Sequence, residues 1–109
     1  MLDSCVQLGL ALSQKNDTAG AANVFKEIIR REPNSAEAHN NLGLVQLQAG
    51  NLATAQSEFD EALRLRPQYA EAHYNLAIAL HQQGKEAESQ AEFEKAGEIS
   101  PELKNAPRP

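Results

Sequence analysis

The sequence of 109 residues has no tryptophan, a single cysteine and only 5% aromatic residues. One cysteine cannot form an internal disulfide, which is compatible with a reducing compartment. Because large rings are scarce, a core has to be built from Leu, Ala, Val and Ile, with Phe25, Phe59 and Phe93 as its largest side chains. The 41% hydrophobic and 23% charged residues are ordinary for one globular domain.

Long apolar segments and a basic leader are also lacking. The longest apolar run, from Val6 to Leu12, is far too short to span a bilayer. The N-terminus has no basic region of a secretion signal, because Asp3 precedes any Lys or Arg. We therefore expect no membrane association and a cytoplasmic location.

Motifs that carry chemistry are missing as well. The sequence contains no HExxH, GxGxxG, P-loop or GxSxG pattern. Its net charge of -5 argues against nucleic acid as the main partner. Several arginines instead precede a proline in the last turn of a predicted helix, where they complement the helix dipole. We expect no enzymatic activity, no cofactor, no metal and no nucleic-acid partner.

What the sequence does contain is a threefold internal repeat with a period of 34 residues. Three columns define it: Leu8, Leu42 and Leu76; Phe25, Phe59 and Phe93; Pro33, Pro67 and Pro101. Within each unit, apolar residues recur at helical spacing in two segments separated by a turn. A hairpin of two such helices cannot bury both apolar faces alone, so each unit needs a neighbour.

Turn and cap signals set the helix boundaries. The predicted helices are Leu2 to Lys15, Thr18 to Arg31, Ala36 up to the turn at Gly50, Leu52 to Leu65, and two equivalents in the third unit. Gly50 and Gly84 supply a left-handed turn that Asn16 tolerates in the first unit. Ser35 is a plausible N-cap, and the prolines stop the second helix of each unit.

The Leu-Gly, Ala, Phe, Ala and Pro pattern at this period resembles the tetratricopeptide repeat (TPR) family. The resemblance covers Leu2 to Leu103 and implies an all-α, right-handed solenoid of six antiparallel helices. It predicts one domain over residues 1–103, with repeats 2–35, 36–69 and 70–103. The remaining tail, 104–109, has two prolines and is expected to be disordered.

One column departs from the family, because Cys5, His39 and His73 replace its large aromatic residue. Successive repeats place the two histidines about one repeat apart, too far to share a metal, so a structural role is favoured. For Cys5 a small buried hydrophobe is favoured over a reactive thiol.

In the family, the first helix of each repeat lines a concave groove. The residues that the resemblance places there are Gln7, Leu10, Asn40, Asn41, Leu44, Gln48, Tyr74, Asn75, Ile78 and Gln82. They mix amides with aliphatic side chains, which suits an extended peptide. The sequence therefore favours a non-catalytic module that binds a protein or peptide partner.

Two binding modes of the family can be compared residue by residue. The carboxylate clamp that grips acidic chaperone C-termini keeps only Asn41 here, and Glu71 at another clamp position would repel a carboxylate. The run from Ala36 to Gly43 instead resembles the superhelical TPR region of O-linked N-acetylglucosamine transferase, whose asparagine ladder binds peptide backbone. Asn41 and Asn75, with Gln7 as a weaker third rung, would form such a ladder. The alternative is that these amides brace neighbouring helices.

Two other functions stay open at this point. The chain could be a fragment of the substrate-binding arm of a larger enzyme, such as a glycosyltransferase, or a structural assembly spacer. The ends of the solenoid lack a dedicated capping helix, which predicts weak self-association. Against this, Glu86 and Gly97 make the last helix more polar than its two equivalents.

Overall fold

The computed structural model describes the backbone of residues 2–15 and 17–105 and the side chains of residues 7–15 and 17–103. It contains α1 (Leu2–Gln14), α2 (Thr18–Arg31), α3 (Ala36–Gln48), α4 (Leu52–Leu65), α5 (Ala70–Gln82), α6 (Glu86–Ile99) and a 3-10 helix, η1 (Pro101–Asn105). No strand occurs in these ranges, so the predicted all-α fold of six helices is confirmed.

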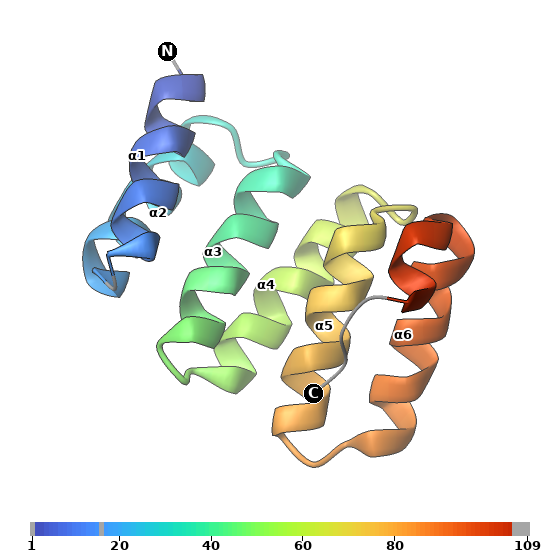
Figure 1. Ribbon diagram of the computed structural model, residues 1–109. Helices are drawn as coiled ribbons and strands as arrows, with labels where there is room; N and C mark the ends of the chain where they lie inside the picture. Colours follow the sequence, from blue (N-terminus) through green and yellow to red (C-terminus); the bar gives the residue numbers. More distant parts are fainter. Residues whose placement is uncertain (1, 16, 106–109) are drawn as a thin grey trace.

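The helices pack in chain order as three hairpins. Figure 1 shows α1, α3 and α5 following one another in one layer, with α2 and α4 beside them in a second layer and α6 at the C-terminal end. Each second helix contacts both the helix before it and the helix after it, and α3 also touches α5 directly. The core is therefore a row of seams between neighbouring helices, as a solenoid requires.

Local signals place the helix ends where the sequence predicts them. Gly50 and Gly84 have φ of +85° and +84°, the left-handed region that favours glycine. The Ser35 hydroxyl accepts a hydrogen bond of 3.2 Å from the Ala38 amide and caps α3. Asp17 does the same for α2 through the Gly20 amide. The predicted turn residue Asn16 lies outside the described residues.

The first and second hairpins are each closed by a phenylalanine of the second helix that packs against a glycine of the first helix. Phe25 and Phe59 are fully buried, and a Cβ added at Gly9 or Gly43 would lie 2.6 Å from the ring of the corresponding phenylalanine. The prediction that the phenylalanines form the core is confirmed, since Phe93 is also buried. Glycine at these two positions is required by the close approach of the ring.

The seams between hairpins are closed by a leucine of each first helix. Leu42 and Leu76 are each 4% exposed because α2 and α4 precede and cover them, whereas Leu8 at the same repeat position is 53% exposed. The apolar surface of one repeat is thus buried by its predecessor, and α1 presents the uncovered half of such a seam. None of the helices in the described part of the chain is both long and apolar enough to cross a bilayer.

The C-terminal end differs from the prediction. η1 packs on α6 and continues to Asn105, so Lys104 and Asn105 belong to a short helix, while residues 106–109 lie outside the described range. Leu103 is half-buried in η1. The turn at Ser100-Pro101 stands at the same repeat position as the turn at Arg66-Pro67, and η1 begins at this turn.

The leucine column provides a matched test of this account of stability. Leu42→Ala should lower the free energy of unfolding by about 2 to 5 kcal/mol, because it opens a cavity in a closed seam. Leu8→Ala, the same substitution at the same repeat position, should change it by less than about 0.5 kcal/mol, because the side chain is exposed. Urea unfolding followed by circular dichroism measures both. Equal losses in the two variants would contradict the assignment of the seams.

Candidate functional site

The exposed side of the layer formed by α1, α3 and α5, here called the α1–α3–α5 face, holds the predicted groove residues. Its charges are of one sign. The ranges 2–14, 36–48 and 70–82 contain the acids Asp3, Glu37 and Glu71 and no lysine or arginine. Glu37 and Glu71 are exposed, and neither forms an ion pair with a described residue. This face is therefore acidic, and its other polar groups are mainly amides.

Amides link the first helices of the second and third repeats. The Asn75 amide donates a hydrogen bond of 3.0 Å to the Asn40 carbonyl oxygen, and the Asn40 amide lies 3.5 Å from the Tyr69 hydroxyl. Asn40 is 1% exposed, which differs from the open groove surface predicted for it. The reason is that α5 packs directly against α3 and covers this side chain. Asn40 and Asn75 thus brace neighbouring helices, which is the alternative to peptide binding given in the sequence analysis.

Asn41 has no such partner. Asn75 is hydrogen-bonded to Asn40, which lies 35 residues earlier in the sequence. The residue 35 positions before Asn41 is Val6, whose side chain has no polar atom. No described residue hydrogen-bonds the Asn41 amide, although the residue is only 8% exposed. Every fully buried polar side-chain atom among the described residues has a hydrogen-bond partner. Since the Asn41 amide has no such partner, it must reach the solvent. One of the two predicted rungs is therefore occupied within the chain and the other is open.

The other predicted groove residues divide in the same way. Gln48 is tied to α1, because its amide donates to the Ser13 carbonyl at 2.9 Å and accepts from the Ser13 hydroxyl at 2.6 Å. Leu44 packs partly into the core around Phe59. The remaining members keep some accessible surface: Gln7, Leu10 and Gln82 are exposed, and Tyr74 and Ile78 are half-buried. Tyr74 also stacks edge to face on Phe93, with ring centroids 5.6 Å apart.

Tyr69 is a member of the face that the sequence did not single out. It precedes α5, touches the amide pair through its hydroxyl and carries the Arg66 guanidinium 4.6 Å above its ring. Burial raises the pKa of the Tyr69 phenol, and the carboxylates of Glu71 and then Glu37 raise this pKa further. The sequence did not single out Tyr69 because it lies in the predicted loop before a helix. The corresponding residues of the other repeats, Ser35 and Leu103, are of different types.

The two histidines have the structural role predicted for them. The His39 ring contacts Glu58 at 2.8 Å through Nδ1 and the Pro33 carbonyl at 3.2 Å through Nε2. His73 repeats both contacts with Glu92 and the Pro67 carbonyl, each at 2.9 Å. Each ring ties a first helix to its own second helix and to the preceding loop. The side chain of Cys5 lies outside the described residues.

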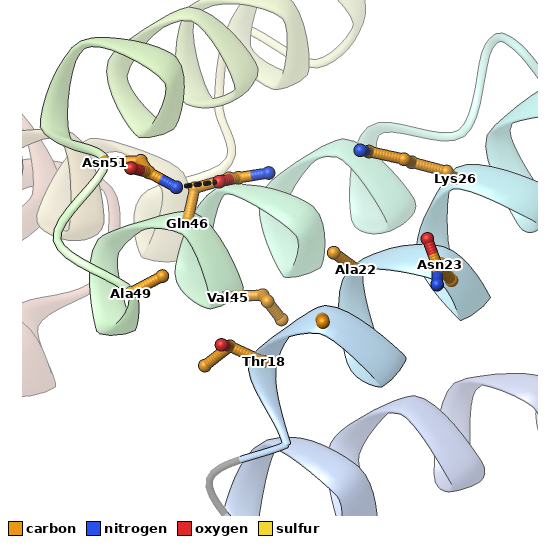
Figure 2. A pocket seen from close by; sticks show the side chains of 9 residues that line it. Thr18, Ala22, Asn23, Lys26, Val45, Gln46, Ala49 and Asn51 are labelled. Carbon is orange, nitrogen blue, oxygen red and sulfur yellow. Dashed lines mark hydrogen bonds between the residues drawn. The ribbon is translucent and has the colours of Figure 1, made fainter.

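A hollow of about 300 Å³ lies elsewhere, in the seam between α2 and α3. Figure 2 shows Lys26, Asn23 and Thr18 on one side and the hydrogen-bonded Gln46 and Asn51 on the other. At the next seam, Gln56 and Gln83 join by a hydrogen bond of 2.8 Å, whereas this seam has alanines at both places. The sequence did not predict the hollow. Its only signal there is that the small Ala22 and Ala49 stand at the repeat positions where the next seam has the larger Gln56 and Gln83.

The two kinds of amide predict different responses to truncation. Asn40→Ala should lower the free energy of unfolding by roughly 1 to 3 kcal/mol, because it leaves the amide of Asn75 buried without its acceptor. Asn41→Ala should change it by less than about 0.5 kcal/mol, because no bond inside the chain is lost. Chemical unfolding of both variants and of the wild type measures the difference. A loss in Asn41→Ala as large as in Asn40→Ala would show that Asn41 is also a brace.

Comparison with family models places the whole array in one family. A tetratricopeptide repeat model matches residues 6–55, a TPR repeat model matches residues 47–84, and another tetratricopeptide repeat model matches residues 70–103. Together the matches run without a gap from residue 6 to residue 103. A comparison with curated proteins finds no match.

Several solved structures share the fold. A mutant of MamA is 25% identical, with a TM-score of 0.79 over 91% of this chain and 72% of its own. Another MamA structure is 23% identical, with a TM-score of 0.83 over 92% of this chain and 58% of its own. The first TPR of Spaghetti (RPAP3), bound to the HSP90 peptide SRMEEVD, is 18% identical, with a TM-score of 0.89 over 95% and 85%.

Proposed function

Because this chain belongs to the tetratricopeptide repeat family, we propose that it is a non-catalytic module that binds an extended segment of another protein across the α1–α3–α5 face. The observation that carries the proposal is the Asn41 amide, 8% exposed and without a partner among the described residues. An amide can donate and accept at once, which matches the N–H and C=O groups of an extended backbone. Exposed Leu10 and half-buried Ile78 add apolar contact on the same face.

The neighbouring RPAP3 structure holds an acidic HSP90 peptide, and its low identity makes it a guide to the fold alone. The first helices of this chain offer no lysine or arginine to such a peptide, and Glu37 and Glu71 would repel its carboxylates. The proposed ligand is therefore an extended segment without a cluster of acids. Asn41 acts as its main backbone anchor, because Asn75 already donates one amide hydrogen to Asn40.

The substrate-binding arm of a larger enzyme, such as a glycosyltransferase, is a variant of the same proposal. It rests on the resemblance of the Asn41 and Asn75 column to the asparagine ladder of O-linked N-acetylglucosamine transferase. The two readings share the binding face and differ only in what else the gene encodes. A catalytic domain in the same open reading frame decides for the enzyme arm.

A truncation of the open rung tests peptide binding. Blocked-end, proline-free peptides selected on the immobilised protein should bind Asn41→Ala roughly two- to tenfold more weakly for each hydrogen bond lost. Asn23→Ala serves as the control, because it removes an exposed amide from α2, beside the hollow. Calorimetry measures the affinities. Unchanged binding by Asn41→Ala with weaker binding by Asn23→Ala would move the peptide to the hollow and refute the proposal.

Assembly through the open end of α1 is the second candidate function, favoured by the exposure of Leu8 where its equivalents are covered. The uncovered seam can accept a helix of the α2 or α4 type from another copy. Light scattering at rising protein concentration should then show oligomers that Leu8→Lys removes, because the lysine prevents apolar docking. A monodisperse monomer at every concentration would leave the spacer function without support.

A further inference from the structure

The α1–α3–α5 face combines three observations that together narrow the ligand. It has two exposed carboxylates and a nearly buried amide that have no partner among the described residues, and its three helices contain no lysine or arginine. We infer, on the basis of the proposed function, that the bound segment carries a lysine or arginine side chain. This side chain lies between Glu37 and Glu71, beside the peptide backbone that Asn41 anchors.

The positions of the acids support one shared cation site. Glu37 and Asn41 are four residues apart on α3, so they lie on the same side of that helix, one turn from each other. Glu71 occupies the corresponding place on α5, which contacts α3. Glu37 lies three residues before Asn40 and Glu71 four residues before Asn75, so both acids lie about one helical turn from the 3.0 Å hydrogen bond that joins α5 to α3. A long basic side chain can therefore reach both from a backbone that lies along Asn41.

Other charged groups near the site leave it unneutralised. The nearest base is Arg66, whose guanidinium is already stacked on the Tyr69 ring from the end of α4. Arg30, Arg31 and Arg64 are paired with glutamates of their own helices. The dipoles of α3 and α5 favour an acid in the first turn, which explains the sign of Glu37 and Glu71. The dipole does not explain the absence of lysine and arginine from the remaining turns, and a cationic ligand does.

Four peptide pools test the inference directly. Each is a random, blocked-end peptide library, differing only in a fixed central residue: lysine, arginine, glutamine or glutamate. The lysine and arginine pools should bind roughly two- to tenfold more tightly than the glutamine pool, as expected for one cation beside two exposed carboxylates, and the glutamate pool most weakly. Raising the salt concentration from about 50 mM to about 500 mM should remove the difference, because exposed charges are then screened.

A charge-matched pair of double variants assigns the preference to the site. Glu37→Gln with Glu71→Gln should bind all four pools alike, at the affinity of the glutamine pool. Glu94→Gln with Glu98→Gln, two exposed acids of α6, changes the net charge by the same amount and should keep the preference for lysine. Loss of the preference in both would mean that overall charge is responsible and would overturn the inference.

The outcomes separate this inference from the proposed function. Equal binding of all pools, or a preference for glutamate, overturns the cation site while peptide binding stands. No binding by any pool overturns both. An optical check needs no ligand: in a Tyr74→Phe background, Glu37→Gln with Glu71→Gln should lower the pKa of Tyr69 measured by absorbance. An unchanged pKa would show that the two carboxylates do not act on one place.

Discussion

Burial of each repeat by the repeat before it is the interaction on which the rest of the structure depends. Leu42 and Leu76 are covered, Leu8 is not, and sequence position within the repeat is the same for all three. The first two hairpins close through a phenylalanine ring that lies against a glycine, and in the third the buried Phe93 packs edge to face on Tyr74. Stability is therefore a sum of hairpin and seam contributions, and the open face of α1 is a direct consequence of nearest-neighbour packing.

The polar side chains follow the same geometry. His39 and His73 make identical contacts because their acceptors, a glutamate and a proline carbonyl, also recur every 34 residues. The amide column does not repeat so faithfully. Asn75 finds an acceptor in the preceding repeat, whereas the position that would serve Asn41 is a valine. One residue of the first repeat thus distinguishes Asn41, which has no hydrogen-bond partner among the described residues, from Asn75, which has one.

Charge is distributed by layer. The arginines near the ends of α2 and α4 pair with acids on the same helices or stack on Tyr69, while the first helices contain acids and no lysine or arginine. The net charge of -5 is therefore not spread evenly over the surface. The α1–α3–α5 face carries the exposed carboxylates Glu37 and Glu71.

The sequence by itself determined the helices, the turns and the core, because each depends on residues close in the chain or on a period that can be counted. Leucine, phenylalanine and proline columns predict the hairpins, and Gly50, Gly84 and Ser35 predict their turns and cap. Only the tertiary structure decided which amides are free, because Asn40, Asn41 and Asn75 look alike as letters. Their fates depend on what α5 and α1 place opposite them. Tyr69 is part of the α1–α3–α5 face, and η1 covers part of α6, for the same reason. Contacts between repeats depend on the residues of the neighbouring element, which the sequence of one repeat does not specify.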